Sequence, residues 1–184
     1  MTKAFLLFLV FGACSLPAHA PAQQAAKTKA PGEEISIKLR GIDGHLYDSN
    51  EMRGSVLLIS FGATWCKPCD AELRALEELK KEYGNRPVRF FWVSIERVEE
   101  VSDKGLRDFA KRLKLSFPVL RDGGQFTYAQ FSTRVRVPLL VFFDREGNFA
   151  PPTHFGMSTS TELYKRRVRE RLNGLLAAQS SGAR

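Results

Sequence analysis

Three short apolar runs along the chain predict the buried strands of one sheet. Each is rich in aromatic or β-branched residues and lacks a polar face, which is typical of strands covered on both sides. The runs occupy residues 56–61, 88–95 and 139–143. Ahead of them, residues 35–47 alternate apolar and polar positions around a Gly-rich turn, which predicts a small N-terminal β-hairpin.

Between and after these strands, the apolar spacing changes to that of helices. One helical face is shared by Cys69, Leu73, Leu76, Leu79 and Tyr83. This predicts a helix from Cys66 to Gly84, with Asp70–Arg74 and Glu77–Lys81 as i, i+4 pairs. Further helices are predicted over residues 103–113, capped by Ser102, and over residues 159–176.

The order of these elements predicts the fold class. Strand, helix and strand, then a second helix, two more strands and a closing helix give an α/β fold with a mixed central β-sheet, flanking helices and an N-terminal hairpin. Residues 148–150 are expected to pair as an edge strand. With 184 residues, of which 43% are hydrophobic, the chain can bury one full core.

The first residues resemble an export signal. Lys3 precedes an apolar run over residues 4–13, about half of the roughly 20 residues that span a membrane. We therefore expect a signal peptide over residues 1–22, a flexible tether over 23–32 and a domain over 33–184. The mature protein would then work outside the cytoplasm, in the periplasm.

A second interpretation of this segment involves its cysteine. Phe11-Gly12-Ala13-Cys14 is similar to a bacterial lipobox, in which the cysteine becomes the acylated first residue of a lipoprotein. The signal would then end before Cys14, and the protein would be attached to a membrane through it. Both interpretations stay open.

The net charge of +8 does not alter the predicted fold or compartment. Much of it lies in a run of Lys and Arg over residues 165–171, on the polar face of the closing helix. We interpret this as a solvated face, and nucleic acid is not an expected partner outside the cytoplasm.

The stretch FGATWCKPC, residues 61–69, carries the candidate chemistry. A C-x-x-C pair serves redox reactions, metal sites or small staples. A zinc site needs four ligands, and His45 and His154 lie far away without ligand spacing, so no metal is expected. A staple across two residues would restrain the unfolded chain little. A redox-active Cys66–Cys69 disulfide, which requires no cofactor, is the favoured interpretation.

The position of the pair at a helix start assigns different roles to its two sulfurs. Unpaired backbone N–H groups and the helix dipole favour a thiolate at Cys66, which we expect to be exposed and nucleophilic. Cys69 lies one turn further along the apolar face and would resolve the mixed disulfide. Pro68 suits the first helical turn, and Lys67 adds a positive charge or is simply solvated.

These motifs resemble the thioredoxin-like family, specifically its exported TlpA-like branch of thiol–disulfide oxidoreductases. The similarity extends over most of residues 33–176. It rests on residues 63–69, on Glu72, on Phe117-Pro118 followed by Asp122, on Val137-Pro138, and on Asp144-Arg145 with Gly147.

The resemblance implies a thioredoxin-like fold and further site residues. Val137-Pro138 would be a cis peptide beside the pair, Val137 would pair with a bound substrate segment, and Trp65, Lys67 and Pro68 would complete the substrate-binding surface. Glu72 would tune or shuttle protons for Cys69, although a simple first-turn acid is the alternative.

Two positions depart from the family pattern. Ser60 stands where cytoplasmic thioredoxins have a buried Asp, and Gly62 stands where relatives usually carry Trp. The surface beside the pair is therefore expected to be flatter or more open than in relatives.

The expected function is reduction of disulfides in exported proteins, with apocytochrome c as one candidate substrate and a membrane thiol carrier as electron donor. The alternatives are an oxidase that uses the same residues and a copper- or thiol-binding module without turnover. A peroxide-reducing enzyme is disfavoured, because Thr64 lies only two residues before Cys66 and the usual Pro-x-x-x-Thr-x-x-Cys spacing is absent.

Overall fold

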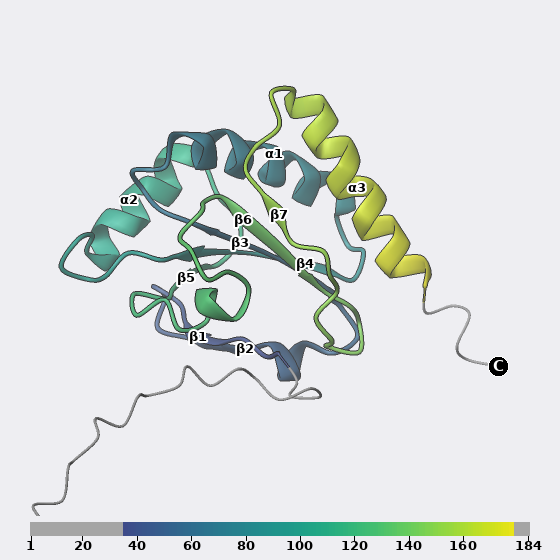
Figure 1. The fold of residues 1–184 in the computed structure, drawn as a ribbon, viewed down its shortest axis with the longest axis horizontal. Helices are drawn as coiled ribbons and strands as arrows, with labels where there is room; N and C mark the ends of the chain where they lie inside the picture. The colour runs from purple at the N-terminus through teal and green to yellow at the C-terminus, as the bar shows by residue number, and fades with distance from the viewer. Residues whose placement is uncertain (1–34, 179–184) are drawn as a thin grey trace, which may run out of the picture. The chain divides into compact units, whose positions relative to one another are not determined.

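The computed structural model describes residues 35–178 (Figure 1). The expected signal peptide, the tether and Cys14 lie outside the described residues, as do the two ends of the expected domain. Within residues 35–178, no helix is long and apolar enough to cross a membrane.

The central sheet is mixed, as predicted. Its five strands are β3 (Val56–Gly62), β4 (Val88–Ser94), β5 (Val119–Arg121), β6 (Leu139–Phe143) and β7 (His154–Phe155). They lie in the order β5-β4-β3-β6-β7, with β3, β4 and β5 parallel. Strand β6 runs antiparallel to β3, and β7 runs antiparallel to β6. All seven residues of β3 are buried, so the central strand is covered on both faces.

Helices cover one face of this sheet. They are α1 (Lys67–Tyr83), α2 (Asp103–Leu113) and α3 (Thr161–Ala177). Figure 1 shows these helices on the same side of the sheet. Their apolar faces pack on alternate residues of the strands, among them Leu58, Trp92 and Phe142. The three predicted helices are confirmed to within two residues, and α1 ends where Gly84 adopts a positive φ of 50°.

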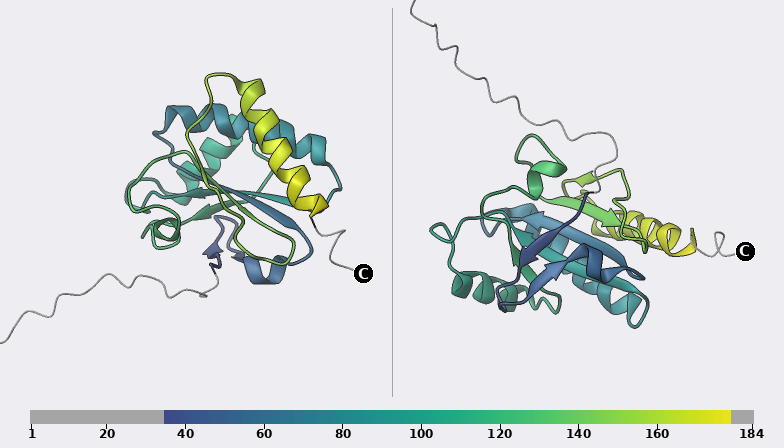
Figure 2. Two further views of the ribbon diagram at one scale, coloured as in Figure 1. Left: turned by 45° about the vertical axis from the view of Figure 1, so that its right-hand side comes forward. Right: turned by 90° about the horizontal axis from the view of Figure 1, so that it is seen from below.

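The N-terminal hairpin and two short 3₁₀ helices lie on the opposite face, as the two views of Figure 2 show. They are β1 (Lys38–Arg40), β2 (Leu46–Asp48), η1 (Ser49–Met52) and η2 (Tyr128–Gln130). The other alternate strand residues, among them Leu57, Phe91 and Val141, pack with them in a second apolar cluster. The predicted hairpin and the α/β class are therefore confirmed.

The predicted edge pairing of residues 148–150 is confirmed as a single antiparallel bridge between Phe149 and Phe143, while the edge strand of the sheet is β7. The two ion pairs predicted within α1 were wrong. On α1, Asp70 pairs with Arg112 of α2 at 2.8 Å instead of with a residue on its own helix. The buried carboxylate of Glu77 likewise accepts hydrogen bonds from the backbone N and the hydroxyl of Ser116, at 2.9 and 2.7 Å. Helix packing brings these partners closer than the i, i+4 positions.

We predict that Leu76→Ala, at a fully buried position of α1, lowers the free energy of unfolding by about 2–5 kcal/mol, because it leaves a cavity between α1 and the sheet. Leu46→Ala is the matched control, because Leu46 is 51% exposed. That change should cost less than about 0.5 kcal/mol. Urea denaturation of the oxidised proteins measures both values, and equal losses would contradict this description of the core.

Candidate active site at the start of helix α1

The site forms where β3 passes into α1. Strand β3 ends at Gly62, and the backbone N–H of Cys66 donates to the carbonyl of Ala63 at 3.1 Å, closing a tight turn. Cys66 is the N-cap of α1, and Pro68 lies in the first turn, where its missing N–H costs no helix bond. The local sequence therefore places the first cysteine at the helix N-terminus, as predicted.

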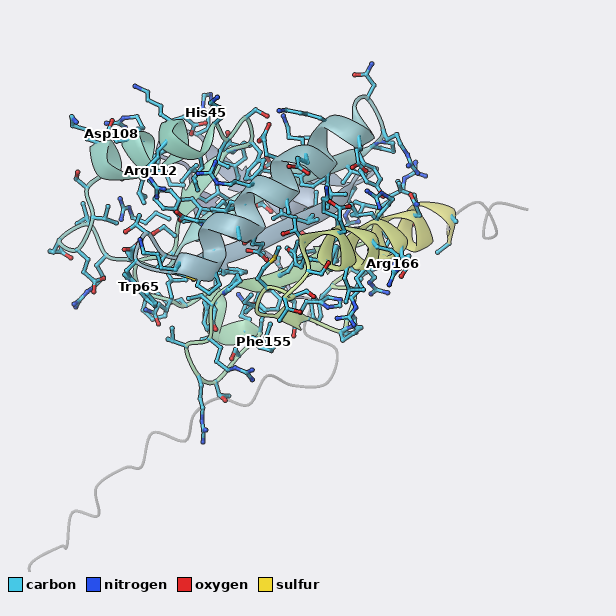
Figure 3. All side chains as sticks on the ribbon, turned by 90° about the horizontal axis from the view of Figure 1, so that it is seen from above. His45, Trp65, Asp108, Arg112, Phe155 and Arg166 are labelled. Atoms are coloured by element: carbon cyan, nitrogen blue, oxygen red, sulfur yellow. A yellow bond between two sulfur atoms is a disulfide. The ribbon has the colours of Figure 1, made fainter. Side chains whose placement is uncertain are left out.

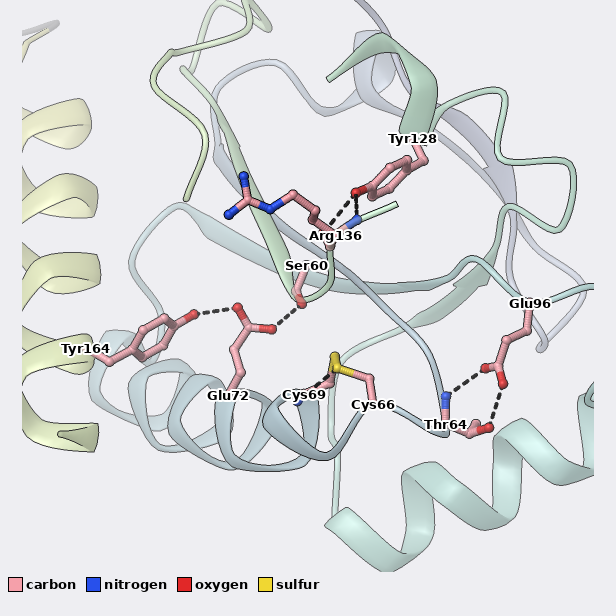
Figure 4. The surroundings of a disulfide bond; sticks show 9 residues. All are labelled: Ser60, Thr64, Cys66, Cys69, Glu72, Glu96, Tyr128, Arg136 and Tyr164. Atoms are coloured by element: carbon pink, nitrogen blue, oxygen red, sulfur yellow. Dashed lines mark hydrogen bonds between the residues drawn. A yellow bond between two sulfur atoms is a disulfide. The ribbon is translucent and has the colours of Figure 1, made fainter. Parts of the chain in front are cut away.

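Cys66 and Cys69 form a disulfide, with a Cα–Cα distance of 5.3 Å (Figure 4). The Cys66 sulfur also accepts a hydrogen bond from the backbone N–H of Cys69 at 3.3 Å, so it serves as the capping acceptor of α1. Such a donor stabilises negative charge on this sulfur once the disulfide opens.

Cys66 is less open than the sequence suggested. It is only 4% exposed and Cys69 is 0% exposed, because the disulfide and the capping bond hold the first sulfur against the start of the helix. The expectation of an exposed Cys66 is thus wrong for the oxidised protein. The order of exposure between the two cysteines is as expected.

A buried carboxylate fixes the loop before the pair. Glu96, which follows β4 and is 4% exposed, accepts hydrogen bonds from the backbone N–H and the hydroxyl of Thr64, both at 2.7 Å (Figure 4). Glu96 was not among the site residues predicted from the sequence. An acidic residue directly after a buried strand was the signal that could have pointed to it.

Glu72 is a second buried carboxylate, one turn after Cys69 on α1. It is 1% exposed and accepts hydrogen bonds from Ser60 Oγ at 2.7 Å and from the Tyr164 hydroxyl at 2.8 Å (Figure 4). Burial raises the pKa of Glu72 to about 7, although both hydrogen bonds oppose the shift. Glu72 is therefore not a solvated first-turn acid, and Ser60 is one of its two donors.

Tyr164 comes from α3, far away in the sequence. It lies within the helix predicted over residues 159–176, but no role was predicted for its hydroxyl. Burial and the neighbouring Glu72 carboxylate raise the pKa of Tyr164 well above its ordinary value, so the hydroxyl stays a donor. Three elements, β3, α1 and α3, therefore meet at one carboxyl group.

The loop before β6 lies beside the pair. Its Val137-Pro138 peptide is cis, as the resemblance implied. The Tyr128 hydroxyl accepts a hydrogen bond from the backbone N–H of Arg136 at 2.7 Å and lies 2.8 Å from the carbonyl of the same residue. Asp122 in turn accepts from the backbone N–H of Tyr128 at 2.7 Å. Asp122 and Tyr128 therefore hold this loop in place.

An open groove of about 360 Å³ lies next to this loop. It is lined by Trp65, Val135, Arg136, Val137, Phe155 and Gly156. Trp65 is 62% exposed, and the Arg136 guanidinium lies 4.7 Å from the centre of the Phe155 ring. Trp65 and Phe155 are labelled in Figure 3. The structure thus brings Trp65 and Val137 together in one groove, whereas Lys67 and Pro68 lie exposed on the first turn of α1.

Within residues 35–178, no group of three or more His, Cys, Asp or Glu side chains is arranged to hold a metal ion. The site itself consists of two cysteines at a helix start, a buried carboxyl group one turn away and a groove beside them. This arrangement suits thiol–disulfide exchange.

The fold and the C-x-x-C disulfide at the strand–helix junction define a thioredoxin-like protein. The model of the AhpC/TSA family matches residues 23–150, more than half of the chain, and the chain belongs to this family. The resemblance to the thioredoxin-like family is thus confirmed, and the named relatives agree with the TlpA-like branch.

Three relatives illustrate the similarity. The thioredoxin-like protein YneN of Bacillus subtilis is 37% identical over 86 residues, which are 47% of this chain and 49% of that protein. The thiol-disulfide oxidoreductase ResA of Bacillus cereus is 26% identical over 115 residues, 62% of this chain and 64% of that protein. The chain thus spans about half to just under two thirds of these curated relatives.

The third relative is a crystal structure, that of the exposed lipoprotein thioredoxin of Streptococcus pneumoniae strain TIGR4. It superposes with a TM-score of 0.60 at 26% identity, covering 75% of this chain and 98% of that one. The thioredoxin-like fold is therefore shared over nearly the whole of that structure.

We predict that Glu72 makes the fold less stable as the pH rises. Its pKa is about 7 in the folded protein and 4.5 when unfolded, so its contribution is fully present below pH 4.5 and is lost as the pH rises through 7. The loss is on the order of 3 kcal/mol. Urea denaturation of the oxidised protein across this range should show the decline, and Glu72→Gln should flatten it. An equal decline in both proteins would contradict the shifted pKa.

Proposed function

We propose that the protein is an extracytoplasmic thiol–disulfide oxidoreductase that reduces disulfides of other exported proteins. One observation carries the proposal: the Cys66 sulfur is the capping acceptor of α1 and is bonded to the fully buried Cys69. A sulfur at a helix N-terminus ionises readily, and a shielded partner three residues on can resolve what the first forms.

The reaction runs in two exchange steps from the reduced pair. The Cys66 thiolate attacks one sulfur of a substrate disulfide, forms a mixed disulfide and releases the other substrate sulfur as a thiolate. The Cys69 thiolate then attacks Cys66, releases the second substrate thiolate and leaves the Cys66–Cys69 disulfide. Two electrons pass to the substrate, and the protein is oxidised.

Glu72 is the proposed proton acceptor for Cys69 in the second step. Cys69 and Glu72 lie three positions apart on α1 and face the same side of the helix (Figure 4). The pKa of Glu72 is about 7. A carboxyl group with this pKa exchanges protons near neutral pH. Ser60 and Tyr164 would keep it oriented through their hydrogen bonds.

The groove beside the pair is the proposed substrate site. An extended segment there would pack against Trp65 and Phe155 and would pair with the backbone of Val137, next to cis-Pro138. Exposed aromatic side chains and open backbone groups recognise an extended segment with little demand on its sequence. Oxidised cysteines of exported proteins, with apocytochrome c as one candidate, are the proposed substrates.

The proposed electron source is a thiol carrier in the membrane, which would keep the pair reduced. The expected signal peptide supports export, and acylation of Cys14 would hold the domain near such a carrier. A thioredoxin named as an exposed lipoprotein, that of S. pneumoniae, supports the second arrangement. An oxidase would use the same residues in the opposite direction, with the direction set by the reduction potential.

We predict that Cys66→Ser abolishes dithiothreitol-driven reduction of insulin, because the attacking thiolate is lost. Cys69→Ser should instead accumulate mixed disulfides, which non-reducing electrophoresis detects, because nothing resolves them. The matched control is Cys14→Ser, which removes the remaining cysteine of the chain and should keep full turnover.

Turnover by the Cys66→Ser protein would show that the roles are assigned wrongly. If the wild-type protein reduced no insulin but retained one copper ion per chain through gel filtration, the binding module would replace the enzyme as the better description.

A further inference from the structure

One buried donor lies beside the cysteine pair without a partner. Trp92 of β4 is 0% exposed, and its indole Nε1–H makes no hydrogen bond within the described part of the chain. A buried Trp normally pairs this group, and leaving it unpaired destabilises the fold. An unpaired N–H in the core, next to a reactive site, therefore needs a physical explanation.

The indole is held firmly in its place. Trp92 pairs with Ser60 in the register of β3 and β4, so both residues lie on the face of the sheet that the helices cover. Its ring stacks on Phe109 of α2, with the ring centres 4.8 Å apart and the planes at 20°. This stacking fixes the direction in which the N–H points.

Because Gly62 has no side chain, the indole nitrogen of Trp92 can lie close to its Cα. A Cβ on Gly62 would lie 2.7 Å from Trp92 Nε1 and 3.2 Å from Cys69 Sγ. The first distance is too short for any side chain. The bare Cα of Gly62 therefore leaves the indole nitrogen and the Cys69 sulfur next to the same small space, with no side chain from β3 between them.

Whether Cys69 is in a disulfide or is a thiolate determines how strongly its sulfur can accept a hydrogen bond from the indole N–H of Trp92. The sulfur of a disulfide is a weak acceptor, whereas a thiolate is a strong one and forms charge-assisted hydrogen bonds. When the pair is reduced, Cys69 must ionise at a fully buried position, which is costly without a donor. The Cys66 sulfur has the backbone N–H of Cys69 for this purpose.

We propose that Trp92 donates a hydrogen bond from Nε1–H to the Cys69 sulfur in the reduced protein and thereby promotes its ionisation for the resolving step. The donor that is unpaired in the oxidised protein is thus reserved for the thiolate. This inference deepens the proposed function and rests on it, because Cys69 must act as a thiolate for the bond to matter.

The first test measures ionisation of Cys69 without any turnover. In a Cys66→Ser background, the pH dependence of iodoacetamide alkylation is followed by mass spectrometry on the peptide that contains Cys69. Trp92→Phe, which keeps an aromatic ring but removes the donor, should raise the pKa of Cys69 by about one pH unit or more.

Phe109→Tyr is the matched control, because it changes the residue that stacks on Trp92 but keeps both the stacked aromatic ring and the N–H. Its effect on the pKa of Cys69 should be much smaller. Glu72 on α1 and Tyr164 on α3 are buried titratable groups at this face, and Arg112, which pairs with Asp70, lies over the Phe109 ring. The comparison is therefore repeated with Glu72→Gln, where the Trp92 effect must persist. An unchanged pKa in Trp92→Phe would overturn the proposal.

A second readout uses the unmodified chain and does not depend on whether Trp92→Phe folds. The indole ¹⁵N–¹H signal of Trp92, distinguished from that of Trp65 with a Trp65→Phe protein, should move downfield on reduction and should titrate together with Cys69. A signal that stays in place would overturn the proposal.

The outcomes separate this inference from the proposed function. A protein that reduces no insulin but shows the Trp92 effect contradicts only the proposed function. An active reductase in which neither the alkylation pKa nor the indole signal moves contradicts only the role of Trp92.

Discussion

Burial of strand β3 on both faces is the constraint on which the site depends. Because β3 is paired to β4 on one side and to β6 on the other, its end at Gly62 cannot shift relative to the sheet. The turn that follows therefore delivers Cys66 to the start of α1 at a fixed point. The cis-Pro138 loop is fixed by the same sheet, because it leads directly into β6.

Polar groups buried around this junction make the two sulfurs chemically different. Cys66 receives a backbone N–H at the helix start, whereas Cys69 lies among Glu72, Trp92 and the sheet. The buried carboxylates of Glu72 and Glu96 are bonded to donors from other elements of the chain, which rigidifies the site. The first turn of α1 is exposed and the second cysteine is shielded. This arrangement suits attack on a substrate disulfide by Cys66 and resolution of the mixed disulfide by Cys69.

The features that depend on local pattern could be predicted from the sequence. The contacts between side chains of distant elements could not. The strands, the helices and the C-x-x-C pair follow from periodicity and spacing, and cis-Pro138 followed from family resemblance. The role of Tyr164 could not be found in this way, because its partner Glu72 lies 92 residues away. The position of Glu96 after a strand was a signal, but it did not identify Thr64, 32 residues away, as the partner. Gly62 was noticed as a departure, but only the structure shows that Trp92 occupies the space a side chain would need.

The reduction potential of the Cys66–Cys69 pair tests the central claim most directly. The protein would be equilibrated with dithiothreitol or glutathione buffers of defined ratio, and the reduced fraction would be measured by thiol alkylation. A disulfide reductase should have a potential near that of thioredoxin, about −270 mV. A value near about −120 mV, typical of a strong disulfide oxidant, would contradict the proposed direction.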